Sequence, residues 1–151
     1  MVEARLDAGG AFVIDLWFDF DALLLGLSPA APAPDRLVAM ESLRRAGRDA
    51  EAAAVARLSE LLRRRLRARF DGEAVPFAIA FPDNRDATAG ELVTLGGRVR
   101  LDGRAPQGAR AFTFFASRSF RGVDLRVGVG ERRSRQILEP GVESKPIPLD
   151  G

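Results

Sequence analysis

Asp15, Asp19 and Asp21 are the acidic residues whose spacing best suits a cation site. They occupy odd-numbered positions of a segment whose even-numbered positions are apolar, and a strand would place all three carboxylates on one face. The Cα atoms of Asp19 and Asp21 would then lie about 6 to 7 Å apart. A hard cation such as calcium could bind this pair if another loop supplied more oxygens. No EF-hand pattern is present, and the simpler interpretation is a solvated strand face.

The residue types needed for most enzymatic mechanisms are missing. Histidine, cysteine and tyrosine do not occur, which excludes Ser-His-Asp and Cys-His nucleophiles, histidine acid/base chemistry and zinc sites built from His and Cys. Asp83, Asn84, Asp86 and Glu91 gather oxygens in one stretch, but their spacing matches no metal motif and favours an exposed turn. A glycosidase built on two carboxylates stays open, although no pair stands out. We predict a non-enzymatic protein without a cofactor.

Arginine dominates the basic residues, because Lys145 is the only lysine among 23. The densest basic cluster is the run of Arg63, Arg64, Arg65, Arg67 and Arg69, of which the first three in particular could contact a partner or anionic headgroups. Trp17 and Phe115 could be outward-facing aromatic residues that mark a contact surface, Trp17 together with the arginines, although the simpler interpretation is that both pack under the helical insertion. The alternative is a solvated face with ion pairs. No aromatic residues interleave the run, so we expect no nucleic-acid binding.

Residues 2–21 have the pattern of a β-hairpin. A short strand over residues 2–6 is followed by a turn over residues 7–10, where two glycines suit positive φ. From Phe12 to Phe20 an apolar residue recurs at every second position, which is the strongest strand signal in the chain. One face of this strand should therefore line the core.

Residues 35–64 are predicted to form a helical insertion. Asp35 follows a proline-rich connector as a candidate N-cap, and Asp49 can cap a second helix. Apolar residues of both helices recur at helical spacing, so we expect them to pack on the rest of the protein while Arg57 and Arg64 stay in water. The packing residues expected from this spacing are Leu37, Leu43, Val55, Leu58 and Leu62.

Residues 65–149 read as the remaining strands, including a second hairpin over residues 65–81 and short strands separated by glycine-rich turns. This spacing predicts a mostly β fold, an Ig-like antiparallel β-sandwich with a helical insertion. The whole chain, residues 1–151, suits a single soluble domain. The expected core residues are Phe12, Ile14, Leu16, Phe18, Val75, Phe77, Ile79, Phe112, Phe114, Leu125 and Val127.

Four segments of the chain resemble the extracytoplasmic N-terminal region of HupE/UreJ-like membrane proteins. They are Val2-Glu-Ala-Arg-Leu with the strand that follows it, Leu66-Arg-Ala-Arg-Phe-Asp-Gly72 with Val75-Pro-Phe77, the segment Phe112 to Phe120, and Ser134-Arg-Gln-Ile-Leu-Glu-Pro-Gly141. In that family a soluble domain precedes a membrane region with a histidine-bearing motif, and the family is associated with nickel supply for hydrogenase and urease. Neither the membrane region nor its motif occurs in residues 1–151.

The resemblance implies a non-enzymatic accessory or interaction domain on the extracytoplasmic, periplasmic side, attached to the membrane in the full-length protein. Its expected partner is the membrane region of that protein, and a second candidate partner is another extracytoplasmic protein. Residues 1–4 do not resemble a signal peptide, so this location requires a signal ahead of residue 2 and membrane helices beyond residue 151. The alternative is a carbohydrate- or small-ligand-binding sandwich. Ligand identity and oligomeric state stay open.

Nickel is the metal that the resemblance brings to mind, but the residues argue against a nickel site in this chain. Protein nickel sites draw largely on imidazole and thiolate ligands, and the sequence contains neither. Carboxylates alone favour hard cations. We therefore expect any role in nickel supply to be indirect.

Overall fold

The protein is built from ten strands and three helices within the residues that the computed structural model describes, 1–84 and 97–150. The strands are β1 (Val2–Leu6), β2 (Ala11–Trp17), β3 (Leu66–Phe70), β4 (Glu73–Val75), β5 (Phe77–Ala80), β6 (Arg98–Arg104), β7 (Ala111–Ala116), β8 (Val123–Val129), β9 (Arg132–Leu138) and β10 (Ile147–Pro148). The helices are α1 (Phe20–Leu24), α2 (Ala33–Ala46) and α3 (Arg48–Arg65), with 3-10 turns at η1 (Pro82–Asn84) and η3 (Arg118–Phe120). A strand predicted over residues 92–95 lies outside the described residues.

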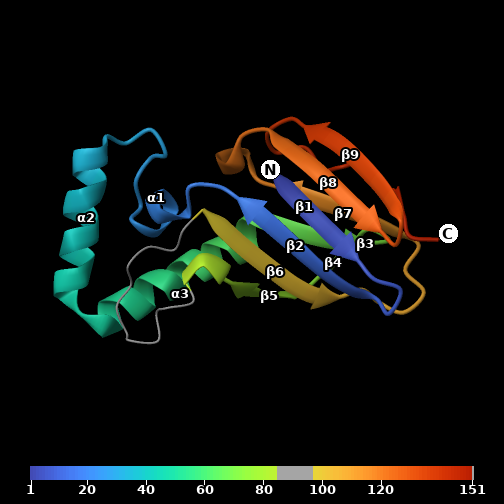
Figure 1. The fold of residues 1–151 in the computed structure, drawn as a ribbon, viewed down its shortest axis with the longest axis horizontal. Coiled ribbons are helices and arrows are strands. Elements are labelled where there is room, and N and C mark those ends of the chain that lie inside the picture. The colour runs from blue at the N-terminus through green and yellow to red at the C-terminus, as the bar shows by residue number, and fades with distance from the viewer. Residues whose placement is uncertain (85–96, 151) are drawn as a thin grey trace.

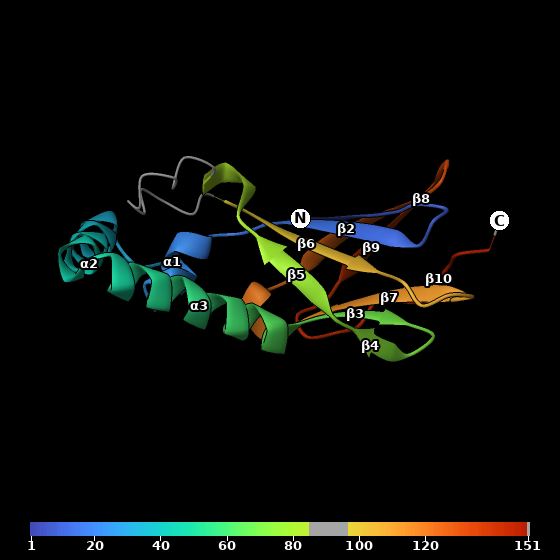
Figure 2. The same cartoon turned by 90° about the horizontal axis from the view of Figure 1, so that it is seen from below.

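Two sheets face each other and enclose the apolar core. One sheet has the strand order β5-β6-β2-β1-β8-β9, and the other has the order β10-β7-β3-β4. Figure 2 shows the sheets as two layers, with the helices extending from one end. The prediction of a mostly β sandwich with a helical insertion is therefore confirmed. One pair departs from the antiparallel pattern: β1 and β8 are parallel, because the chain crosses between the sheets at η3 before β8 begins.

The first hairpin has the predicted register as far as the end of β2. Ala4 pairs with Ile14 across the hairpin, and Phe12, Ile14 and Leu16 are buried. The prediction that the strand continues to residue 21 is wrong, because Phe20 begins α1 and is buried there instead. Asp19 accounts for the change, since its side chain caps the helix and local capping overrides the alternation.

The centre of the core is a row of phenylalanines that joins the two sheets. Phe70 on β3 lies between Phe12 and Phe112, with ring centroids 5.4 Å and 5.3 Å apart. Aromatic pairs at this separation add stability beyond the area that they bury. Phe18 is only partly buried but packs against this core.

The helical insertion is longer than predicted, and its two main helices differ in burial. Ala54, Leu58 and Leu62 of α3 are buried, as their spacing predicts, whereas no residue of α2 is buried. Figure 1 shows α2 standing away from the sandwich beyond α1 and α3. The prediction that Leu37 packs on the sandwich is wrong, because its side chain on α2 is 71% exposed.

The predicted N-caps of both helices are also wrong. Asp35 and Asp49 lie in the first turns, and the cap positions are Pro32 and Gly47. Proline fits the first turn of a helix, which lets α2 begin before Asp35. Gly47 has a φ of 93°, which ends α2 and allows α3 to start at the next residue in a new direction.

The second predicted hairpin is divided between the two sheets. The turn at Asp71 and Gly72 joins β3 to β4, but Pro76 then sends the chain to the other sheet, where β5 pairs with β6. Both β4 and β5 are edge strands. Their apolar residues Val75, Phe77 and Ile79 are therefore partly buried against the core, and not fully buried as predicted.

The C-terminal segment is joined to β9 by a side chain of that strand. The Oε1 of Gln136 accepts a hydrogen bond from the Lys145 amide at 2.8 Å, and its Nε2 donates to the Lys145 carbonyl at 3.2 Å. One amide side chain thus satisfies both backbone groups of a neighbouring residue. This pairing holds the C-terminal segment along the edge of the sheet.

Candidate functional site

The predicted cation candidates, Asp19 and Asp21, lie at the start of α1 and not on a strand face. The Oδ1 of Asp19 accepts a hydrogen bond from the Ala22 amide at 3.0 Å, and its Oδ2 forms an ion pair with Arg36. Both carboxylate oxygens of Asp19 therefore already have a donor. In the described part of the chain, no group of three acidic residues lies close enough together to hold a metal. The prediction that Asp15, Asp19 and Asp21 share one strand face is therefore wrong. The cation site itself stays a prediction.

Asp15, the third aspartate of that prediction, is bound by two arginines of neighbouring strands. It is 3% exposed, although it points to the outer face of the six-stranded sheet. Arg100 lies opposite it on β6 and donates to both of its oxygens, and Arg5 on β1 donates from Nη2 at 2.9 Å. The two arginines cover the carboxylate and compensate its charge. Asp15 is thus an anchor for three neighbouring strands.

The predicted basic run Arg63, Arg64 and Arg65 forms the last turn of α3. Arg63 pairs with Glu60 at 3.0 Å, and cations at this end complement the helix dipole. Arg67 on β3 adds a cap, because its Nη1 donates to the carbonyl oxygens of Arg63 and Arg64 at 2.7 Å and 2.8 Å. Part of this cluster therefore stabilises the end of the helix.

Trp17, the predicted aromatic member of the same contact surface, lies elsewhere in the fold. It ends β2 on the outer face of the six-stranded sheet, opposite Arg98 of β6. Arg98 in turn forms an ion pair with Asp83 at 3.3 Å. The structure brings the three arginines of α3 together but places Trp17 on a different element. A contact surface at either place stays a prediction.

A different arginine arrangement lies on the outer face of β1, β8 and β9. Gly128 on β8 is the register partner of both Arg5 on β1 and Arg133 on β9, so the three residues form a row across three strands. Strands are spaced about 4.8 Å apart, which puts the Cα atoms of the two arginines about 10 Å apart. Gly128 has no side chain to separate them.

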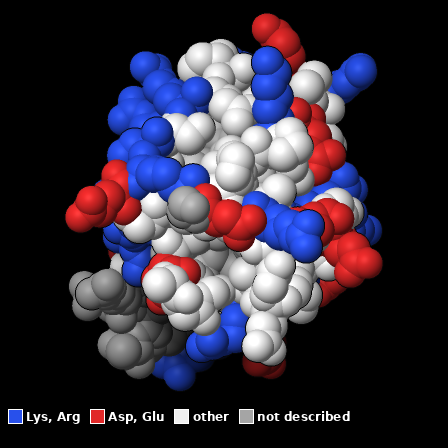
Figure 3. Space-filling view, turned by 90° about the vertical axis from the view of Figure 1, so that its right-hand side faces the viewer, with Lys and Arg blue, Asp and Glu red and all other residues white. Residues whose placement is uncertain are grey.

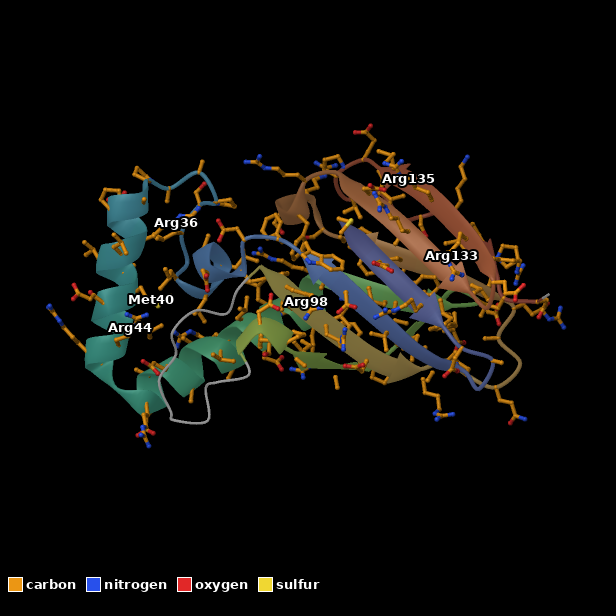
Figure 4. All side chains as sticks on the ribbon, in the orientation of Figure 1. Arg36, Met40, Arg44, Arg98, Arg133 and Arg135 are labelled. Atoms are coloured by element: carbon orange, nitrogen blue, oxygen red, sulfur yellow. The ribbon has the colours of Figure 1, made fainter. Side chains whose placement is uncertain are left out.

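The guanidinium of Arg133 lies against the backbone in this gap. A Cβ atom at position 128 would be 3.2 Å from its Nη1 and 3.4 Å from its Cζ. The Nη1 donates to the carbonyl oxygens of Gly130 and Arg132. Among residues 1–84 and 97–150, Arg133 has no carboxylate partner. Figure 4 shows Arg133 and Arg135 on the side of β8 and β9 that faces the viewer.

The next row on this face holds an ion-paired cluster. Asp124 on β8 accepts two hydrogen bonds from Arg135, at 2.8 Å and 3.1 Å, and one from Arg126 at 3.2 Å. The Arg135 hydrogen bond is the main cause that lowers the pKa of Asp124; burial opposes it, and the hydrogen bond from Arg126 lowers the pKa further by a smaller amount. The same bond raises the pKa of Arg135. These two arginines are therefore already partly neutralised.

A groove of about 880 Å³ follows the two rows between β1 and β9. Its floor is formed by the backbone of β8 at Gly128 together with the Arg133 guanidinium that lies against it. More cationic than anionic side chains line it, and among them Arg133 is the one without an acid partner in the described structure. The charged lining residues are Glu3, Arg5, Asp7, Arg126, Arg133 and Arg135.

A second cavity, of about 980 Å³, opens at the end of the sandwich opposite the helices. The loops over residues 7–10, 105–109 and 130–131 form its rim, together with Leu149. Figure 3 shows this end of the molecule, where uncharged surface in the middle is bordered by side chains of both charges. Backbone groups of glycine-rich loops and a few charged side chains could hold a small polar ligand there.

A third hollow, of about 640 Å³, lies along α2 and is mostly apolar. Leu25, Leu37 and Met40 contribute apolar surface, and Arg36 and Arg44 lie one turn on either side of Met40. Figure 4 shows these three labelled α2 residues following one another along the helix. Arg36 is tied to the preceding loop, because its guanidinium donates to the carbonyl oxygens of Pro29 and Ala31.

Sequence reasoning missed the groove on β1, β8 and β9 for a specific reason. It selected arginines that are adjacent in the chain, whereas those of the groove are neighbours through strand register. The alternation of Arg133 and Arg135 on a strand was a usable signal that both face the same side. The contribution of Arg5 depends on the parallel pairing of β1 with β8, which the sequence pattern did not indicate.

Comparison with known proteins found no family model that matches the chain and no match among curated proteins. None of the helices in residues 1–84 and 97–150 combines the length and the apolar character needed to cross a membrane.

Proposed function

We propose that the chain is a non-enzymatic interaction domain, the extracytoplasmic accessory domain of a HupE/UreJ-like membrane protein, and that it docks through α2. The observation behind this proposal is that α2 has 14 residues and buries none of them. Helices in proteins gain most of their stability from packing an apolar face. A helix that exposes Leu37 by 71% and Val38 by 66% is therefore suited to packing against another protein.

The proposed occupant of the hollow along α2 is the membrane region of the same full-length protein. An apolar strip that includes Leu37 and Met40 lies beside charged side chains of both signs, and such a strip suits packing against a protein surface with an apolar centre and a polar rim. The charged side chains are Asp21, Arg36, Glu41 and Arg44. The position of α2 at one end of the molecule leaves both sheets clear of this contact (Figure 1). The four segments that carry the family resemblance lie mostly in strands of the sandwich, so the resemblance concerns the scaffold and not α2.

Site-specific photo-crosslinking in the full-length protein in native membranes tests the docking. A photoreactive residue at Leu37 should crosslink to the membrane region of the same chain, as identified by mass spectrometry. Ile137 on β9 is the matched control, since it is an apolar residue of similar exposure, 68%, on a different surface. Equal crosslinking at both positions, or products with other proteins alone, would contradict the proposal. A gene without membrane helices after residue 151 would overturn the membrane attachment.

Any connection with nickel supply is proposed to be indirect, through this docking. Calorimetric titration of the tag-free chain with nickel, zinc and calcium checks the point. We expect no stoichiometric nickel site tighter than about 10 μM, because imidazole and thiolate ligands are missing from the sequence. A tighter site that disappears on replacing Asp19 or Asp21 would instead indicate direct metal capture.

A second candidate function is binding of a carbohydrate or other small polar ligand. The cavity of about 980 Å³ at the loop end of the sandwich favours it, because its volume lies in the range of small-molecule sites. Screening the chain against a glycan array, with Arg104→Ala as the variant at the rim, distinguishes this function from docking. Glycan binding that Arg104→Ala abolishes, without an effect of Leu37→Asp, would favour the ligand-binding module.

A further inference from the structure

We propose that the groove over Gly128 binds the phosphate group of a small organic phosphate, held between Arg133 and Arg5. This site is separate from the proposed docking helix, because α2 and the strands β8 and β9 lie at different ends of the molecule (Figure 1). The phosphate site is therefore independent of docking through α2, and each can be tested without the other.

The first argument is the geometry of the row Arg5–Gly128–Arg133. Arg5 and Arg133 lie on one outer face, on strands either side of Gly128. The Arg133 guanidinium covers Gly128, and that of Arg5 bonds Asp15 on β2 through Nη2 alone. A planar guanidinium donates through several N–H groups at fixed angles, which suits the oxygens of a phosphate. A carboxylate has two oxygens, which one guanidinium group can satisfy. An anion that bridges two guanidinium groups needs the additional oxygens and charge of a phosphate.

The second argument is the unequal pairing of the arginines. Arg126 and Arg135 share Asp124, and Arg5 uses one nitrogen, Nη2, for Asp15. Arg133 donates only to backbone carbonyl oxygens within the described residues. Arg133 is therefore the cation with most to gain from an anion, and Arg5 has N–H groups besides the one bonded to Asp15.

The third argument concerns the size of the ligand. The groove of about 880 Å³ suits a small molecule. A bilayer surface fits less well, because Glu3 and Asp7 line the groove and Asp124 lies beside it on the same face. These acids would repel a sheet of anionic headgroups, whereas a single phosphate can lie beside the Arg133 guanidinium, which itself covers Gly128. The occupant is thus a free organic phosphate and not a membrane.

Titration of the ¹⁵N-labelled chain with pyrophosphate, followed by amide chemical shifts, tests the site. We expect saturable binding with a Kd of about 1 mM or tighter, with the largest shifts around Gly128 and Arg133. Acetate at equal ionic strength should bind at least tenfold more weakly. Saturation without shifts on β8 and β9, or no saturation by about ten times that concentration, would overturn the proposal.

Two variants make the test specific. Arg133→Gln should weaken pyrophosphate binding at least tenfold, whereas Arg57→Gln, the same charge change on an exposed position of α3, should not. Gly128→Ala keeps every charge but pushes the Arg133 guanidinium away, since the new Cβ would be 3.2 Å from Nη1. It should weaken binding severalfold. Unchanged binding in both Arg133→Gln and Gly128→Ala contradicts the proposal.

Vesicles of phosphatidylglycerol and phosphatidylcholine provide the remaining comparison. We expect no sedimentation of the chain with these vesicles at physiological ionic strength. Sedimentation that requires Arg133, in the absence of pyrophosphate binding, would show a membrane-contact surface and would refute the small-ligand site.

Discussion

Arg100 on β6 binds the Asp15 carboxylate on β2 at two points, with Nε 2.9 Å from Oδ1 and Nη2 3.1 Å from Oδ2. The two residues are direct register partners, so the pair holds adjacent strands together on the outer face of the sheet. Arg5 extends the contact to β1 on the other side. A carboxylate that is almost completely covered is tolerated here because both flanking strands supply a cation.

Asp15→Asn is therefore expected to lower the free energy of unfolding by about 1 to 3 kcal/mol. The amide keeps the shape of the side chain but loses the charge that compensates the two guanidinium groups. Urea denaturation measures the difference. Glu3→Gln is the control on the same face, and it should change stability by less than about 0.5 kcal/mol. Equal losses from both variants would mean that Asp15 is not the anchor.

Ile14→Ala should cost about 2 to 5 kcal/mol, because Ile14 is fully buried in the middle of β2. Val13→Ala is the matched control, since Val13 is the neighbouring residue on the opposite face and is only half-buried. Its cost should be clearly smaller. Denaturant titrations of the two variants decide the register, and a loss below about 0.5 kcal/mol at Ile14 would show that the face is wrongly assigned.

An aspartate introduced at an apolar position should destabilise α3 much more than α2. Leu58→Asp on α3 should unfold or detach the helical segment, because Leu58 is only 2% exposed. Arg57→Asp, one residue away on the exposed face, should cost little. Leu37→Asp on α2 should also cost less than about 0.5 kcal/mol in the isolated chain. Far-ultraviolet circular dichroism during thermal unfolding measures all three, and similar midpoints for Leu58→Asp and Leu37→Asp would contradict the burial difference.

Asp124 should contribute stability that depends on pH. Its pKa is lowered in the folded protein, chiefly by the hydrogen bonds from Arg135. The contribution is thus complete above the unfolded-state pKa of about 3.9 and is lost as the pH falls through the lower folded value. Asp124→Asn should be less stable than the wild type at neutral pH, and the gap should close below about pH 4. If the difference in stability between the wild type and Asp124→Asn were the same at pH 7 and pH 3, the ion pair would not be its cause.

The sequence predicted those parts of the fold that depend on short-range periodicity. Alternation identified the buried face of β2 through Phe12, Ile14 and Leu16, and helical spacing identified Leu58 and Leu62. It failed where a local signal competed with the period. Asp19 starts a helix inside the alternating run, and Leu37 follows helical spacing on a helix that has no core to face.

The candidate site was less predictable, because it depends on which strands are neighbours. Arg5 and Arg133 are far apart in the chain, and only the pairing of β8 with both β1 and β9 places them in one row. Gly128 gave no sign of its role, since a glycine within a strand is equally compatible with a bulge. The prediction of a contact surface relied on arginines that are adjacent in the chain, so it selected the end of α3. There Arg67 stabilises the helix end by binding its last carbonyl groups.

Gln136 ties the two sheets to each other through the C-terminal segment. Its side chain binds both backbone groups of Lys145. The preceding residue, Ser144, binds Phe114 of β7 in the other sheet through its backbone amide and its hydroxyl. Adjacent residues of one segment are thus bonded to opposite sheets, so the chain end acts as a non-covalent cross-link between them.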